Sequence, residues 1–223
     1  MSASFRLGPD GIYRCDAFQR FLWQEHGFGT RTASPRVDIT LRQIHSDRVV
    51  NANARSGDRE EEGDALITDQ TGKAIGVRTA DCVPILLLDA KNRAVAAVHA
   101  GWRGSAGQII QRTLESMEAA FGTRPADVHA AFGPSIRVCC YEVREEVAAR
   151  FASLFPEWGE EEKVTRQLNL PEANRRLLLA GGVPPEQIFD LGLCTTCQTA
   201  QFFSYRREPE NSGRMVSSIL RLA

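Results

Sequence analysis

The sequence predicts an α/β (α+β) fold, a single domain of mixed β-sheets flanked by helices that spans residues 1–223. Two observations lead to this prediction. Apolar runs of strand length alternate with amphipathic helical patterns, and two of these runs are joined by a short polar turn, which adds a hairpin to the alternating elements. With 43% hydrophobic and 25% charged residues, the composition is that of an ordinary globular protein that needs no disulfide or metal to form its core.

The first predicted strands are short. Residues 37–41 alternate apolar and polar side chains, the pattern of a half-buried strand, and we expect this strand to run directly into residues 43–45. Residues 65–68 and 74–77 predict two further short strands. The charged stretch at residues 59–62, which precedes them, predicts a solvated loop.

The centre of the chain predicts a buried hairpin followed by a helix. Residues 83–88 and 94–99 are nearly continuous apolar runs of strand length, separated by a polar turn. Apolar residues then recur at helical spacing through residues 110–121, and Gly122 stands where a helix would end.

The remaining elements continue the alternation of strands and helices. Pro171 and the pair Gly181-Gly182 show the asymmetry expected at the start and the end of a helix. The predicted strands are residues 128–132, 188–191 and 214–220, and the predicted helices are residues 142–155 and 171–180.

Charge and hydropathy exclude several classes of partner. The chain carries 27 Lys and Arg residues against 28 Asp and Glu residues, which disfavours general nucleic-acid binding and gives no reason to expect an anionic membrane surface. The longest purely aliphatic run covers residues 85–88, far short of the ~20 residues that a membrane helix needs. The first residues hold no apolar stretch of signal-peptide length, so we expect a cytoplasmic protein with small-molecule partners.

Cysteines and histidines bound the chemistry that the chain can carry out. There are six cysteines, and without an export signal we expect their thiols to be reduced, free to pack, to bind a metal or to act as nucleophiles. There are four histidines. Such a small number limits how many metal ions imidazole ligands could hold.

Three side chains that can bind a metal stand at the edges of strand-like runs: His45, Cys82 and His99. Two imidazoles and one thiolate suit zinc or copper, and three protein ligands leave a fourth position open, as in catalytic zinc sites. The intervals between them match no local metal-binding motif, so ordinary packed or hydrogen-bonded residues remain the alternative on spacing alone.

A glycine-rich turn at residues 101–107 opens the helix predicted over residues 110–121. Backbone N–H groups at a helix start can bind an anion, and Arg103 within the turn could add a bidentate contact to phosphate. The glycine spacing is not GxGxxG, so dinucleotide binding is not supported. The alternative is that these glycines only allow the helix and the sheet to pack closely.

Residues 79–84 (TADCVP) and 99–104 (HAGWRG) resemble the signature of the laccase-domain family, also called the polyphenol oxidase or purine nucleoside phosphorylase laccase-domain proteins. The resemblance covers about residues 26–222. Further matching segments are residues 26–28, 43–45, 64–66, 133–136, 141–143, 194–195 and 203–206. Two departures are Ser46, where a glycine is usual, and a short segment at residues 31–43, where many members carry a helix.

The resemblance implies that residues 1–223 form one laccase-domain-like catalytic domain with metal ligands at His45, Cys82 and His99. It implies zinc-dependent phosphorolysis of adenosine, inosine and methylthioadenosine, with adenosine deamination as a second activity. The implied cofactor is Zn²⁺, with Cu²⁺ as the alternative, and the implied partners are a nucleoside and phosphate.

Roles for further residues follow as hypotheses. Zinc would act as a Lewis acid, and Arg103 would bind phosphate, with Arg78 and Arg206 as further phosphate- or substrate-binding residues. Asp81, beside Cys82, is a candidate catalytic proton carrier, as is Glu142. Asp81 could instead orient a ligand histidine through a hydrogen bond. Stacking on the base could involve Phe28, Trp102 and Phe203, with core packing as the alternative for all three.

Three other functions remain open. A copper-dependent polyphenol oxidase could use a single copper at the same three ligands, although four histidines are too few for a multicopper centre. A metal-free hydrolase could use Cys82 as nucleophile, with His99 or His45 as base. A structural zinc could be enclosed by four thiolates, but the adjacent cysteine pair is poor geometry for this, and packed thiols are favoured. The four residues concerned are Cys139, Cys140, Cys194 and Cys197.

Overall fold

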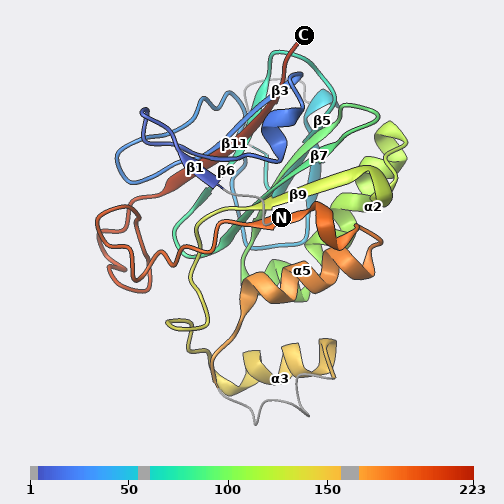
Figure 1. Ribbon diagram of the computed structural model, residues 1–223. Coiled ribbons are helices and arrows are strands. Elements are labelled where there is room, and N and C mark those ends of the chain that lie inside the picture. The colour runs from blue at the N-terminus through green and yellow to red at the C-terminus, as the bar shows by residue number, and fades with distance from the viewer. Residues whose placement is uncertain (1–4, 55–60, 157–165) are drawn as a thin grey trace.

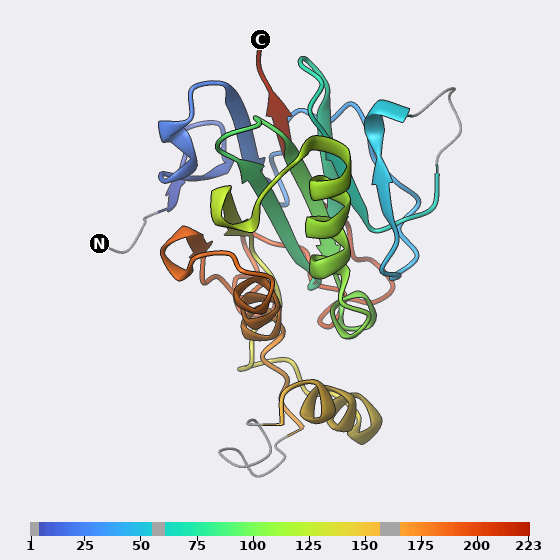
Figure 2. The same cartoon turned by 90° about the vertical axis from the view of Figure 1, so that its right-hand side faces the viewer.

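The computed structural model describes residues 5–54, 61–156 and 166–223. Two β-sheets pack face to face, and helices cover the outer face of the larger sheet (Figure 1). Turned by 90°, the molecule shows the green helix α2 and the orange helix α5 lying against the same face of that sheet (Figure 2). The α/β fold class predicted from the sequence is confirmed.

The smaller sheet has the strand order β1-β2-β3-β11-β6, and its neighbouring strands all pair antiparallel. β11 lies between β3 and β6, so this last strand of the chain is an interior strand of the sheet. The strands are β1 (Phe5–Leu7), β2 (Tyr13–Cys15), β3 (Gln24–Phe28), β11 (Met215–Arg221) and β6 (Ala74–Thr79).

The larger sheet has the order β10-β9-β7-β8-β5-β4 and is mixed. Its centre is the predicted hairpin, in which Val83 pairs with Ala100 and Leu88 with Val95. The two edge strands pair parallel with their neighbours. The strands are β10 (Ile188–Asp190), β9 (Val128–Phe132), β7 (Val83–Asp89), β8 (Val95–Ala100), β5 (Ala65–Thr68) and β4 (Val49–Asn51).

Alternation along β7 divides the interior into two cores that share the larger sheet. Ile85 and Leu87 face the helices, while Leu86 and Leu88 face the smaller sheet, and all four are fully buried. A strand that is buried on both faces has a continuous run of apolar residues rather than an alternating pattern. Residues 83–88 have such a run.

The helices are α1 (Trp102–Ala106), α2 (Ile109–Phe121), α3 (Glu145–Leu154) and α5 (Leu170–Ala180). Short 3₁₀ turns occur at Phe18–Arg20, Ala52–Ala54, Pro125–Asp127 and Pro185–Gln187. α2 ends at Gly122, whose φ of 69° is the left-handed conformation that glycine adopts at little cost. At the start of α5, the Asn169 side chain accepts a hydrogen bond from the backbone N–H of Glu172.

The structure differs from the predictions for the helical segments in two details. α3 starts at Glu145 rather than at residue 142, because the preceding residues pair with a neighbouring segment through hydrogen bonds from Val143 N to Arg166 O and from Leu168 N to Tyr141 O. The helix predicted over residues 110–121 is confirmed as α2, but part of the predicted glycine-rich turn forms the short helix α1, and Gln108 lies between the two helices in a left-handed conformation. The turn therefore does not open directly into the long helix.

The strand predicted over residues 37–41 is also wrong. This segment forms isolated bridges, Ile39 with Ile75 and Arg42 with Glu62, instead of a continuous ladder. The backbone N–H groups of Asp38 and Ile39 both bond to Ala74 O, so the segment crosses the edge of β6 and then leaves it. Of the predicted charged loop at residues 59–62, the first two positions lie outside the described residues.

No helix within residues 5–54, 61–156 and 166–223 is long and apolar enough to cross a membrane. The part of the fold that concerns function is the end of the larger sheet where β7 begins and β8 ends. Cys82 directly precedes β7, and His99 lies in β8 opposite Pro84.

Candidate metal centre

The structure brings together the three metal-capable residues selected from the sequence. The ligand atoms of His45, Cys82 and His99 all lie within 4.8 Å of one another. The two imidazole rings meet edge to face with centroids 4.8 Å apart. His45 reaches this position from a tight loop, in which its φ is 58°, while the hairpin supplies the other two residues. Residues far apart along the chain thus form one N, N, S donor set.

Asp64 organises this donor set, although the sequence did not single it out for a role. Its carboxylate is fully buried and accepts a hydrogen bond from His99 Nδ1 at 2.7 Å. It also accepts from His45 N at 3.0 Å, Ser46 N at 2.6 Å and Ser46 Oγ at 2.7 Å. Since Nδ1 is the donor to Asp64, His99 keeps Nε2 available as a metal ligand. Asp64 directly precedes a predicted strand and lies in a segment, residues 64–66, that carries the family resemblance, and these were the signals for it in the sequence.

Hydrogen bonding also sets the ionisation of Asp64. Burial acts to raise the pKa of this carboxyl, but hydrogen bonds from His99 and Ser46 lower it below the ordinary value. An ionised Asp64 accepts a hydrogen bond from the Nδ1–H group of His99, and this bond fixes the orientation of the imidazole ring. Ser46 therefore adds a hydroxyl contact to the carboxylate that orients His99.

The glycines of the turn allow close packing around the donor set. A Cβ atom on Gly101 would lie 3.0 Å from Cys82 Sγ and 3.2 Å from His45 Cδ2. A Cβ atom on Gly104 would lie 2.8 Å from Ser46 O. These positions support the close-packing interpretation of the glycines. They place the turn directly against the loop that carries His45.

In the absence of a metal, Cys82 and His99 form a charged pair. Burial raises the pKa of the Cys82 thiol, but the charge of His99 and hydrogen bonds with both histidines lower it further, to about 6 from an ordinary 9.0. Burial lowers the pKa of His99, but the Cys82 thiolate and Asp64 raise it to about 9 from 6.5. Between these two values, a thiolate faces an imidazolium.

We expect this pair to be visible by titration of the metal-free protein. Because the pKa of Cys82 is lowered, thiolate should form as the pH rises through about 6, rather than through 9. The measurement is ultraviolet thiolate absorption against pH, for the unmodified chain and for Cys82→Ala. The difference between the two proteins isolates Cys82 from the other thiols. A difference step near the ordinary value would contradict the charged pair.

The donor set opens into a pocket of about 590 Å³, a size common among small-molecule sites. The predicted residues Asp81, Arg78, Arg103 and Arg206 all line this pocket together with the three ligands. The full lining is Leu41, Arg42, Gln43, His45, Arg78, Ala80, Asp81, Cys82, His99, Trp102, Arg103, Ile136, Tyr141, Tyr205, Arg206 and Arg214. Five arginines therefore face a pocket whose described lining includes one carboxylate.

Three of these arginines stack on aromatic rings of the same pocket. The guanidinium carbon of Arg103 lies 4.4 Å from the Trp102 ring centroid, and those of Arg206 and Arg214 lie 5.4 Å and 5.9 Å from Tyr141 and Tyr205. Stacking holds each guanidinium at the pocket wall. Arg206 Nη2 also donates to Glu142 O, and Arg214 Nη1 donates to Ser212 O and Gly213 O. The two tyrosines were not singled out from the sequence, although both lie in segments that carry the family resemblance.

Asp81 does not contact a ligand histidine, which is the role that Asp64 has. Its two carboxylate oxygens accept hydrogen bonds from Thr195 Oγ1 and from the backbone N–H of Arg206, each at 2.6 Å. Asp81 therefore ties the segment around Arg206 to the start of β7. Glu142 is not among the described residues that line the pocket, and its backbone oxygen accepts a hydrogen bond from Arg206 Nη2.

The aromatic residues proposed from the sequence fall in different environments. Trp102 lines the pocket. Phe28 is fully buried in the core between the sheets, so its role is packing. Phe203 lies beneath the Arg31 guanidinium and against Gly213, where an added Cβ atom would meet its ring at 2.6 Å.

The two remaining histidines contribute to packing elsewhere. His26 Nε2 accepts a hydrogen bond from Cys15 N at 2.8 Å, and His129 lies against the Phe21 and Phe189 rings. The four histidines of the chain are thus divided, with two at the donor set and two outside it. A cluster of several copper ions, each needing imidazole ligands, does not fit this distribution.

Comparisons with known proteins agree with the geometry. A family profile described as "Multi-copper polyphenol oxidoreductase laccase" matches residues 26–222. The purine nucleoside phosphorylase of Deinococcus radiodurans is 44% identical over 177 residues, which cover 78% of this chain and 66% of that protein. The adenosine deaminase RL5, from an unknown prokaryotic organism, is 40% identical over 198 residues, covering 82% of this chain and 74% of that protein.

A solved structure shares the fold along nearly the whole chain. The crystal structure of the hypothetical protein YfiH of Bacillus licheniformis superimposes with a TM-score of 0.86 at 27% identity, covering 98% of this chain and 99% of that one. The aligned segment spans slightly less than two thirds of the Deinococcus protein's length. From the matched residues, the shared fold and the donor set, the chain belongs to the laccase-domain family, whose profile carries the polyphenol oxidoreductase description.

Proposed function

We propose that this chain is a zinc-dependent purine nucleoside phosphorylase that acts on adenosine, inosine and methylthioadenosine, with adenosine deamination as a second activity. The observation that carries this proposal is the convergence of His45, Cys82 and His99 within 4.8 Å, in a pocket lined by five arginines. The names of the Deinococcus and RL5 relatives support the same two reactions.

The donor set fits zinc. Two imidazole nitrogens and one thiolate are borderline to soft ligands, and three protein ligands leave room for a further one. Asp64 holds the His99 ring with Nε2 available, and Gly101 leaves space where a side chain would press on Cys82 Sγ. When bound, zinc supplies Lewis-acid chemistry to an oxygen in the pocket.

The other residues of the pocket would bind and orient the substrates. Arg103, Arg78 and Arg206 are proposed to hold phosphate, because planar guanidinium groups match its oxygens in pairs. Asp81 is proposed as the proton carrier, since it has the one carboxylate among the described residues that line the pocket. Trp102, whose ring lies at the wall of the pocket, is proposed to stack on the base.

Two features support the proposed domain organisation and the proposed location of the protein. The two hydrophobic cores share the larger sheet, which supports one catalytic domain over residues 1–223. All six cysteines are unpaired, which is compatible with the proposed location in the cytoplasm.

The test begins with elemental analysis of the purified protein, followed by incubation with adenosine with and without phosphate. Phosphorolysis predicts adenine and ribose 1-phosphate, formed only when phosphate is present. Deamination predicts inosine and ammonia without phosphate; with phosphate it predicts hypoxanthine as well, because inosine is itself a proposed substrate of phosphorolysis. If zinc-loaded protein released neither adenine nor inosine, the proposed function would be wrong.

Arg103→Ala is expected to raise the KM for phosphate at least about tenfold, because a charge-assisted hydrogen bond to phosphate contributes roughly 1.5–3 kcal/mol. The KM for adenosine should change much less. Arg124→Ala is the matched control, since Arg124 is exposed and pairs with Asp127 outside the pocket. Steady-state kinetics with each substrate varied separately gives the measurement. An equal rise in both KM values would argue against a phosphate contact.

A metal-free cysteine hydrolase is the second candidate, favoured by the thiolate–imidazolium pair of Cys82 and His99. Zinc occupies the thiolate and removes it as a nucleophile. Alkylation of zinc-loaded protein therefore separates the two functions. Rapid modification of Cys82 would favour the hydrolase, and protection of Cys82 would favour the metalloenzyme. Copper in the purified protein together with oxidation of phenols would favour the polyphenol oxidase.

A further inference from the structure

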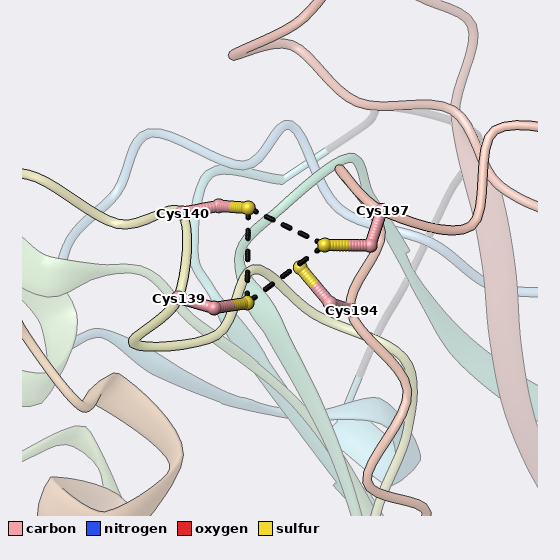
Figure 3. Close-up of side chains that lie close together, drawn as sticks. All are labelled: Cys139, Cys140, Cys194 and Cys197. Carbon is pink, nitrogen blue, oxygen red and sulfur yellow. Dashed lines mark hydrogen bonds between the residues drawn. The ribbon is translucent and has the colours of Figure 1, made fainter.

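Four cysteines form a second cluster, outside the residues of the described pocket lining. Cys139 and Cys140 lie in the turn between β9 and α3, and Cys194 and Cys197 lie in the loop after β10. Figure 3 shows the four side chains directed toward one another from these two loops. Their sulfur atoms all lie within 4.8 Å of one another. The expectation of packed thiols does not describe Cys139 and Cys197, which are exposed.

The three distances among the sulfurs of Cys139, Cys140 and Cys197 are those of a tetrahedral thiolate site. The Sγ atoms of Cys139 and Cys140 are 3.7 Å apart, and those of Cys139 and Cys140 lie 3.8 Å and 3.5 Å from Cys197 Sγ. Four sulfurs at ~2.3 Å from a central zinc would be about 3.8 Å from one another. A disulfide would need ~2.05 Å instead, and all four thiols are free.

The adjacent pair of cysteines, which reasoning from the sequence treated as unfavourable, is accommodated by a tight turn. The backbone N–H groups of Cys140 and Tyr141 both bond to Arg137 O at 2.9 Å. This turn places two successive side chains where both can face Cys197 (Figure 3).

The other two ligands belong to a C-x-x-C segment that is itself well anchored. The backbone N–H of Gln198 bonds to Cys194 O at 3.0 Å, and the backbone N–H groups of Cys197 and Thr196 donate toward Cys194 Sγ. The two loops are joined by Ser135, whose N–H bonds to Leu193 O and whose carbonyl accepts from Thr195 N. Backbone hydrogen bonds within and between the two loops thus hold the four sulfurs close together, in addition to the contacts between the thiols.

We propose that Cys139, Cys140, Cys194 and Cys197 bind a second zinc ion through four thiolates, separate from the ion proposed at His45, Cys82 and His99. Four sulfur ligands close the coordination sphere, so this site is structural rather than catalytic. Zinc binding releases to solvent the protons of those sulfurs that are still thiols. Soft thiolates select zinc over magnesium or calcium, which prefer oxygen.

The second zinc would cross-link two segments that line the pocket. The loop with Cys139 and Cys140 also carries Ile136 and Tyr141, and the segment after Cys197 carries Tyr205 and Arg206. Loss of this ion is therefore expected to weaken substrate binding, while the donor set of the catalytic centre is kept.

Metal counting tests the proposal directly. The unmodified chain, purified under reducing conditions with zinc, should hold two zinc ions by native mass spectrometry. The double variant Cys139→Ser/Cys197→Ser should hold one zinc ion, and so should Cys82→Ala. A protein that carries all three substitutions should hold none. Cys15→Ser is the matched control, because Cys15 is a buried thiol outside both clusters, and this variant should still hold two.

Cobalt substitution identifies the ligands independently of activity. Co²⁺ at four thiolates gives strong sulfur-to-metal charge-transfer absorption, and most of this absorption should disappear in Cys139→Ser/Cys197→Ser. Cys82→Ala should retain most of it. Loss of the greater part of the absorption in Cys82→Ala instead would contradict the four-thiolate site.

A measurement on the unmodified chain does not depend on whether the variants fold. Cys139 and Cys197 are exposed, so their thiols should react readily with an alkylating reagent after a chelator has removed the metal. With zinc bound, all four cysteines should be protected, as read by peptide mass spectrometry. Alkylation at the same rate in both states, a disulfide within the cluster of zinc-loaded protein, or a single bound zinc that depends on Cys82 would each overturn the proposal.

Discussion

Replacing Cys82 with alanine is expected to remove the metal from the His45–Cys82–His99 centre and to reduce phosphorolysis of adenosine to background, while the protein stays folded. The thiolate is one of three protein ligands, and the two histidines left behind bind zinc far more weakly than the complete set. The fold should survive because the cores on either side of the larger sheet do not depend on this side chain. Zinc content, circular dichroism and adenine release measure the three expectations.

Cys15→Ala controls for the loss of a thiol as such, since Cys15 is fully buried in the core between the sheets and remote from the donor set. This control should keep its full metal content and its activity. If Cys82→Ala released adenine at the rate of the unmodified chain, the assignment of the centre would be wrong. An unfolded Cys82→Ala protein would show instead that the site contributes to the stability of the fold.

Asp64→Asn is expected to lower the zinc affinity of the same centre by about 10–100-fold, the usual effect of removing a carboxylate that orients a ligand histidine. The change keeps the shape of the side chain but replaces one hydrogen-bond acceptor with a donor. Asp64 accepts hydrogen bonds from His99 Nδ1, Ser46 and the backbone N–H of His45. One of these donors would then face an N–H group, and the ring of His99 would lose its fixed orientation.

The role of Asp64 is to position a ligand, so the expected signature is specific. Zinc affinity, measured by competition with a chromophoric chelator, should fall, and activity should largely return at saturating zinc. Asp89→Asn is the matched control, because Asp89 is also fully buried and binds the turn at the opposite end of β7. Both variants should lose stability, of the order of 1–3 kcal/mol for an unsatisfied buried group. Equal zinc affinity in the two variants would refute the positioning role.

Much of the fold could be predicted because its central elements carry strong local patterns. The hairpin of β7 and β8 consists of apolar runs buried on both faces, and α2 has a continuous apolar face and a glycine stop. The local patterns missed β1, β2, β3 and β4. Of these, β1, β2 and β4 are each three residues long and carry too few side chains to show a period. The segment at residues 37–41 has the period of a strand but only isolated bridges, because pairing depends on neighbours that the local pattern does not contain.

The donor set of His45, Cys82 and His99 was found in the sequence because its residue types are rare and chemically distinctive. The residues that form hydrogen bonds with these side chains could not be identified in the same way. Asp64 is one of 28 acidic residues, and nothing in its spacing distinguishes a buried carboxylate that orients a histidine from one on a solvated surface. The four-cysteine cluster shows a related limit of prediction from the sequence. Its members were noticed, but adjacency along the chain made Cys139 and Cys140 look incompatible with a common site.

From its sequence alone, this protein is determined to have a mixed α/β architecture around a buried hairpin, together with three nearby side chains that can bind a metal. These features follow from hydrophobic periodicity and residue chemistry, which act within a few residues along the chain. The tertiary structure decided that Asp64 holds His99, that arginines and aromatic rings surround the pocket, and that four thiols meet. Each of these depends on segments far apart along the chain that only the packing of two sheets and a helical layer brings into contact.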